Sequence, residues 1–180
     1  PLAADQNIAQ WSVVRMSKAP SLYGVVADAA VLSAGDNSVT GIPVIQGRRY
    51  TAQAVGAGTG ADDQEFTIST RYIPREYLTV YVNGIEVPRV DSFYGVADTS
   101  MVYAARYDAD GYLTILFGNS SYGLPPAVAS AITADWIVCQ GDAGNFTLET
   151  GSFDSIDGIL KATMNVSQTS SCKGGSNGPS

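Results

Sequence analysis

The clearest structural pattern of the chain lies in Gly111–Asn145, GYLTILFGNSSYGLPPAVASAITADWIVCQGDAGN, which we call the deciding stretch. Two runs within it, Tyr112–Phe117 and Ile132–Cys139, alternate so that every second side chain falls on the same face, a period of two that is typical of β-strands. Between the runs, Pro125–Pro126 cannot donate ladder hydrogen bonds, so the chain must leave the sheet there. The stretch therefore predicts strand, wide loop and strand, followed by a tight glycine turn at Gly141–Asn145.

Two further turn signals on the N-terminal side predict β-hairpins. Asn83-Gly84 separates two alternating runs, and this pair favours a type I′ turn because both central residues need positive φ. Asp108–Gly111 separates Met101–Tyr107 from the first run of the deciding stretch. Pro88 predicts that the strand after Asn83-Gly84 lies at a sheet edge.

The first third of the chain carries weaker signals. Residues 1–10 are expected to form a loose arm, Trp11–Met16 a strand, and Tyr23–Leu32 fits a short helix and a strand equally well. Val39–Ile45 and Arg48–Val55 are predicted to pair with each other about the intervening Gln-Gly.

At the C-terminal side, Phe146–Leu148 is expected to be followed by a polar loop, Glu149–Asp157, and a last strand, Gly158–Ser167, with one solvated face. The spacing of turns predicts a mainly β protein, an antiparallel β-sandwich or open barrel with at most one short helix.

The domain division expected from these signals has three parts. Residues 1–45 form an N-terminal arm and first strands, 46–170 a β-rich core domain, and 171–180 a flexible tail or linker stump. Because the first residue is not Met, we expect a processed chain or a fragment of a larger chain.

Composition limits the classes of partner. The net charge is −7, and the ten basic residues are scattered apart from Arg48–Arg49, which argues against a nucleic-acid interface. No apolar run approaches the roughly 20 residues of a membrane span, so no membrane insertion is expected. Charged residues make up only 15%, against about 25% in typical domains. Either partners cover the surface, or the chain is a β-rich protein whose surface is polar but uncharged.

The sequence offers no catalytic constellation. Histidine is absent, which removes the usual general base and the commonest metal ligand. Gly56–Gly60 lacks the G-x-G-x-x-G spacing of a dinucleotide site, and Asp108–Gly111 lacks the further ligands of a calcium loop. We therefore predict no enzyme activity, no cofactor, no metal and no small-molecule substrate. Cys139 and Cys172 are expected as two unpaired thiols, because a bridge would require the polar tail to fold back.

The deciding stretch also carries a resemblance to a known family. In order, it contains FG-x-x-x-YG-x-P-P, a strand with an aromatic near its end, and G-x-x-G-N. This order resembles that of the baseplate J and baseplate wedge proteins of contractile-tailed phages and related injection machines. Further segments agree in order: Gln46–Thr51, Gly56–Gly60, Gln64–Thr67, Val90–Tyr94, Val102–Tyr103, Asp108–Gly111, Asn165–Val166 and Lys173–Gly175. The chain departs from the family at Asn119, where an acidic residue is usual, and at Ala127, where a glycine is usual.

The resemblance implies a structural subunit of the phage tail baseplate. Such a wedge component assembles around the tail hub with copies of itself and with other wedge or hub proteins, and takes part in the rearrangement that triggers sheath contraction. It would be made in the host bacterial cytoplasm and reside in the virion. The candidate interface and motif residues are Arg48, Arg49, Gly118, Asn119, Tyr122, Gly123, Pro125, Pro126, Gly141, Gly144 and Asn145. Arg48, Arg49, Asn119–Pro126 and the 56–64 loop, with Asp62–Asp63 as a solvated turn, are expected to be exposed.

Two other functions fit the same composition. One is a β-sandwich module of a virion that binds carbohydrate or a cell surface through aromatic and Asn-rich loops. The other is a fragment of a glycosidase that depends on paired carboxylates, although the Asp pairs lie in predicted turns rather than in an aromatic-lined cleft.

Overall fold

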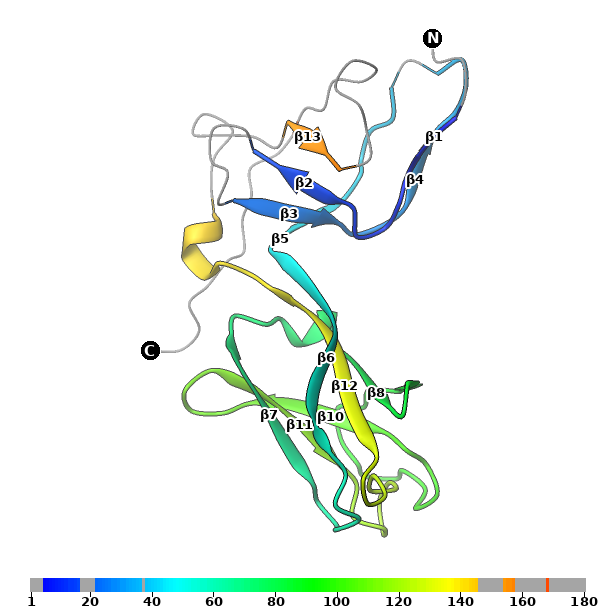
Figure 1. The fold of residues 1–180 in the computed structure, drawn as a ribbon, viewed down its shortest axis with the longest axis vertical. Coiled ribbons are helices and arrows are strands. Elements are labelled where there is room, and N and C mark those ends of the chain that lie inside the picture. The colour runs from blue at the N-terminus through cyan, green and yellow to red at the C-terminus, as the bar shows by residue number, and fades with distance from the viewer. Residues whose placement is uncertain (1–4, 17–21, 37, 146–153, 158–167, 169–180) are drawn as a thin grey trace. The chain divides into compact units, whose positions relative to one another are not determined.

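The computed structural model describes residues 5–16, 22–36, 38–145, 154–157 and 168 (Figure 1). Their contacts divide the chain into two units. The first contains the described residues up to Arg49 and those from Cys139 onward, and the second contains Tyr50–Val138. This division differs from the expected one, which kept residues 46–170 together. The physical reason is a long-range strand pairing that joins residues near 155 to residues near 14.

The first unit consists of short antiparallel strands. β1 (Gln6–Ile8) pairs with β4 (Ala30–Leu32), and a second sheet has the order β13 (Ser155–Ile156), β2 (Val13–Arg15), β3 (Tyr23–Val26), β5 (Val44–Gln46). Its buried core consists of Ile8, Val14, Met16, Val26 and Ile156. One 3₁₀ turn, η2 (Gly141–Gly144), belongs to this unit.

Two expectations change in the first unit, and one alternative is decided. The predicted loose arm contains β1. Tyr23–Leu32, which fitted a helix and a strand equally well, forms the two strands β3 and β4. The predicted polar loop Glu149–Asp157 contains β13. An ion pair supports this last pairing: Arg15 donates to Asp157 at 2.9 Å, and this hydrogen bond lowers the pKa of the Asp157 carboxyl below its ordinary value.

The second unit is built from two antiparallel sheets. One has the order β10 (Tyr103–Tyr107), β11 (Tyr112–Phe117), β7 (Glu65–Arg71), and the other β6 (Arg48–Ala57), β12 (Ala131–Val138), β8 (Thr79–Val82), β9 (Ile85–Val87). A 3₁₀ turn, η1 (Arg75–Tyr77), precedes β8. The predicted mainly β fold is confirmed, and the described strands form no closed barrel.

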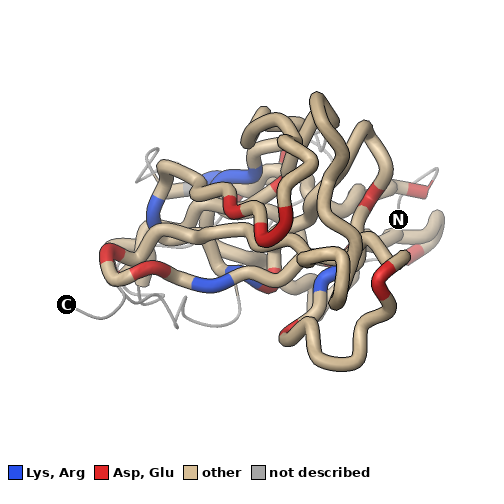
Figure 2. Tube along the Cα trace, turned by 90° about the horizontal axis from the view of Figure 1, so that it is seen from below, with Lys and Arg blue, Asp and Glu red and all other residues tan. Residues whose placement is uncertain are grey.

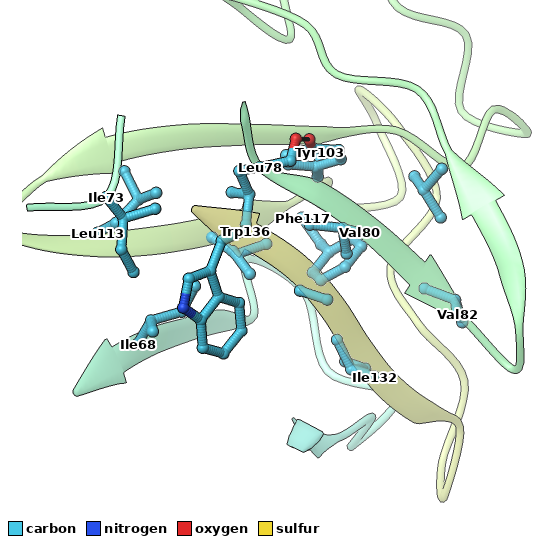
Figure 3. Packing of buried hydrophobic residues seen from close by; sticks show 13 residues of the cluster. Ile68, Ile73, Leu78, Val80, Val82, Tyr103, Leu113, Phe117, Ile132 and Trp136 are labelled. Atoms are coloured by element: carbon cyan, nitrogen blue, oxygen red, sulfur yellow. Dashed lines mark hydrogen bonds between the residues drawn. The ribbon is translucent and has the colours of Figure 1, made fainter. Parts of the chain in front are cut away.

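One hydrophobic core lies between these two sheets (Figure 3). β11 contributes Leu113, Ile115 and Phe117, and β12 contributes Ile132, Ala134 and Trp136, which are the alternating faces that the sequence predicts. Each large aliphatic or aromatic side chain buried in this way contributes about 1.5–3 kcal/mol relative to exposure. The deciding stretch thus supplies one strand to each sheet.

Both predicted hairpins are present. Asn83 and Gly84 adopt φ of 51° and 78° between β8 and β9, and β9 lies at the sheet edge as Pro88 requires. Between β10 and β11, the Asp108 carboxylate accepts hydrogen bonds from the amides of Asp110 and Tyr112, so this segment is a turn.

The predicted pairing of Val39–Ile45 with Arg48–Val55 is wrong. β5 pairs with β3 and β6 lies beside β12, so the two segments belong to different sheets. Several predictions fall on residues that the structure does not describe. These residues are Phe146–Leu148, Gly158–Ser167, Cys172 and the tail from residue 171.

Tyr103 provides a pH-dependent test of the second unit's core. Its side chain is 2% exposed, and its hydroxyl donates to the Leu78 carbonyl at 2.7 Å. Burial raises the pKa of Tyr103 to about 12 from 10.0. The folded state therefore disfavours the phenolate. The protonated Tyr103 hydroxyl contributes fully to the free energy of unfolding below pH 10.0, and this contribution is lost as pH rises towards 12.

We expect Tyr103→Phe to lower the free energy of unfolding by about 1 kcal/mol at neutral pH, because the buried Leu78 carbonyl loses its donor. We also expect a shallower fall in stability above pH 10.0 than in the parent protein. Denaturant unfolding measured across this pH range checks both effects, with Tyr94→Phe as the exposed control. An unchanged slope in Tyr103→Phe would contradict the assignment.

Candidate functional site

Four segments meet at one end of the second unit, and we call them the loop end: the loops 58–64, 90–102 and 118–130, and residues 83–86, which comprise the β8–β9 turn and the start of β9. The strand registers bring them together. β7 begins where β11 ends, since Glu65 pairs with Leu116, and β10 begins opposite Phe117. β8 ends opposite the start of β12, where Val82 pairs with Ile132.

The side chain of Gln64 joins the first loop to the last. It is 6% exposed, and its amide nitrogen donates to the carbonyls of Pro126 at 2.8 Å and Ala61 at 2.9 Å. Its side-chain oxygen accepts from the Thr59 amide at 2.8 Å. The buried carboxamide therefore fixes loop 58–64 against loop 118–130.

Backbone groups complete this junction. The Gly58 amide donates to the Ser130 carbonyl at 2.8 Å, and the Gly58 carbonyl accepts from the Ala129 amide at 2.8 Å. The Asp63 amide donates to the Gly118 carbonyl at 3.1 Å. A Cβ on Gly58 would overlap the carbonyl oxygen of Ala127, and one on Gly118 would overlap the carbonyls of Tyr122 and Gly123. These glycines are therefore required for close approach of backbone to backbone.

Asn119 shapes the loop through its side chain rather than through its backbone. Its side-chain oxygen accepts from the amides of Ser121 at 3.3 Å and Tyr122 at 3.0 Å. The left-handed residue of this turn is Ser120, with φ of 61°. A carboxylate could accept the same two bonds, which makes Asn and Asp equivalent in this turn.

The tips of the loop end are apolar and exposed. Tyr94 is 91% exposed, and four other large hydrophobic side chains are also exposed at this end: Ile85, Tyr122, Leu124 and Val128. Gly118, Gly123 and Pro126 are buried beneath them. Of the residues that the sequence singles out in this loop, Tyr122 is available for contact, while Gly118, Gly123 and Pro126 hold the backbone in place.

A hollow of about 380 Å³ opens to solvent between these tips. It is lined by Asp63, Ser92, Phe93, Tyr94, Gly118, Asn119 and Tyr122. Phe93 packs against Gly123, where a Cβ would come within 3.3 Å of its ring. Three separate segments of the chain therefore contribute to one depression.

The remaining candidate residues belong to the first unit. The carboxamide of Gln46 donates to the Gln140 side chain at 2.6 Å and accepts from the Gln140 amide at 3.1 Å, and Gly144 lies close against it. Gly141 is buried, and Asn145 is exposed after η2. Arg49 lies over the Trp11 ring at 4.7 Å, next to the exposed Arg48.

Sequence reasoning missed part of the hollow. It named the 56–64 loop and Asn119–Pro126 as exposed candidates, but not Ser92 and Phe93 as lining residues, and it treated Asp63 as a solvated turn residue. The available signal was two consecutive aromatics before a glycine, Phe93-Tyr94-Gly95, in a segment without strand alternation.

The described residues contain no group of three His, Cys, Asp or Glu side chains arranged to hold a metal ion. In the same part of the chain, no helix has the length and apolarity needed to cross a bilayer. The loop end therefore presents aromatic and aliphatic side chains, amides and carboxylates on a fixed backbone, and these groups can form contacts with a ligand or partner.

Comparison with known proteins adds no assignment to this description. No protein-family model matches the chain, and no curated protein matches it. The described residues themselves define a mainly β protein with a preformed surface of exposed loops at one end of its second unit.

Gly118→Ala tests whether the loop junction depends on close backbone approach. We expect the free energy of unfolding to fall by about 1–3 kcal/mol, because the added methyl group overlaps two carbonyl oxygens and forces the backbone to shift. Thermal unfolding measures this loss, and Ser121→Ala, an exposed change in the same loop, is the control. If Gly118→Ala were as stable as Ser121→Ala, the loop junction would not depend on close approach of its backbone segments.

Proposed function

We propose that the protein is a structural, non-enzymatic subunit of a phage tail baseplate. In this role it acts as a wedge component that joins copies of itself and other wedge or hub proteins around the tail hub. It takes part in the rearrangement that triggers sheath contraction, is made in the host bacterial cytoplasm and resides in the virion.

The loop end is the observation that supports this proposal. The FG-x-x-x-YG-x-P-P order, on which the resemblance to baseplate proteins rests, spans residues 117–126, of which 118–126 belong to the loop end. Exposed Ile85, Tyr94, Tyr122, Leu124 and Val128 gather there, and clusters of exposed apolar side chains rimmed by polar residues are typical of protein interfaces.

Rigidity also favours docking over catalysis. The tips project from a backbone fixed by Gln64 and by close glycine contacts, so little conformational entropy is lost when a partner binds. Tyrosine suits such a surface because it offers a large contact area with few rotatable bonds.

A second candidate function is the binding of carbohydrate. The hollow combines the exposed rings of Tyr94 and Tyr122 with the amide of Asn119 and the carboxylate of Asp63. Sugar rings stack on aromatic faces while their hydroxyls hydrogen-bond to such groups. Glycan binding by the protein in the absence of any self-association would favour this function over assembly.

Quantitative mass spectrometry of purified contractile tails from the producing host tests the assembly proposal. We expect peptides of this chain at a fixed multiple of six copies per tail, with sheath and tube subunits of the same particles as internal standards. Absence of the chain from intact tails, or a copy number that varies between preparations, would overturn the proposal.

A further inference from the structure

The charged residues in and near the hollow at the loop end are all acidic. Its only charged lining residue is Asp63. Around it, the four segments of the loop end contain Asp62, Asp63, Glu86, Asp91 and Asp98 but no Lys or Arg, and Figure 2 marks acidic positions in red along the chain trace. Such a surface repels anions and attracts cations.

The two neighbouring aspartates differ in their contacts. Asp62 accepts a hydrogen bond from the Ser120 hydroxyl at 2.6 Å, which makes it part of the loop structure. Asp63 lines the hollow, and its backbone amide donates to the Gly118 carbonyl. Among the described residues, no Lys or Arg forms an ion pair with its carboxylate.

Three aromatic rings share the hollow with this carboxylate. Phe93, Tyr94 and Tyr122 all line it, and the faces of such rings attract a cation through their quadrupole. The described part of the chain shows this interaction elsewhere, with Arg49 over Trp11 at 4.7 Å and Arg71 over Tyr112 at 4.9 Å. A ring set with one carboxylate is the arrangement that a guanidinium prefers, because its plane stacks while its edge donates to the oxygens.

Other ligand classes fit less well. A metal ion needs several oxygen ligands, and the lining offers one carboxylate. A neutral sugar can hydrogen-bond to a carboxylate, but it carries no charge for the acidic surroundings to attract. We infer that the hollow formed by Asp63, Phe93, Tyr94 and Tyr122 holds an arginine side chain of a partner protein. The inference rests on the proposed function only in naming a protein as the source of the cation.

Titration of the full chain, followed by ¹H–¹⁵N NMR at constant ionic strength, tests this inference. The probes are blocked Gly-Arg-Gly and Gly-Glu-Gly peptides, choline, and methyl glucoside. We expect only the arginine peptide to shift the amides of Asp63, Ser92–Tyr94 and Asn119–Tyr122 strongly, with a dissociation constant on the order of 1 mM.

Two variants and a matched control make the test specific. Asp63→Asn keeps the left-handed backbone, since φ is 52° there and Asn tolerates it, and should weaken arginine binding about tenfold. Tyr94→Ala should weaken it about 2- to 5-fold. Asp110→Asn, in the β10–β11 turn outside the loop end, should leave it unchanged.

The outcomes separate the inference from the proposed function. Equal binding by Asp63→Asn and the parent protein would overturn the inference, as would stronger binding of glucoside, choline or the Glu peptide. Because the titration needs no tail particle, arginine binding in a chain that is absent from tails would refute the baseplate role while leaving the cation site in place.

Discussion

The buried carboxamide of Gln64 is the interaction on which the loop end depends. It makes hydrogen bonds to three backbone groups, at Thr59, Ala61 and Pro126, and its own main-chain carbonyl accepts from the Phe117 amide at 3.0 Å. Without it, the buried carbonyl of Pro126 would keep only the Gly60 amide as a donor, at 3.1 Å. A hydrogen bond contributes about 0.5–1.5 kcal/mol net to stability, and Gln64 makes three through its side chain, so this side chain is costly to replace.

This constraint explains why the glycines and prolines of the deciding stretch are needed. Gln64 can reach Pro126 only because Gly58 and Gly118 let neighbouring backbone segments approach without a Cβ. The prolines keep segment 118–130 out of the sheet, so its carbonyls remain available to the carboxamide. The result is a fixed base from which Tyr94, Tyr122 and Val128 project, a combination suited to docking.

Much of this fold could be predicted because its signals are local. The alternation in Tyr112–Phe117 identified a buried strand face, and Asn83-Gly84 identified a hairpin, since each depends on residues close in sequence. The sequence also singled out the two loops that meet, 56–64 and Asn119–Pro126. Their polar residues, glycines and prolines can be recognised in the sequence alone.

What could not be predicted depends on long-range pairing. Nothing in β5 or β6 indicates that each pairs with a strand distant in sequence, and the two residues of β13 have too little pattern to reveal their pairing with β2. A single glutamine in a polar loop gives no periodic signal, so the role of Gln64 was not foreseen. The hollow was missed for the same reason, because Asp63, Phe93 and Tyr122 become neighbours only after the sheets pack.

Hydrogen exchange of Gln64→Met tests whether this side chain holds the two loops together, because methionine keeps the length of the side chain and removes its hydrogen bonds. We predict faster exchange at the amides of Gly60, Asp63 and Ser120, in both joined loops, while amides of the β10–β11 hairpin keep their protection. Unchanged exchange in these loops would contradict the claim that Gln64 holds them together.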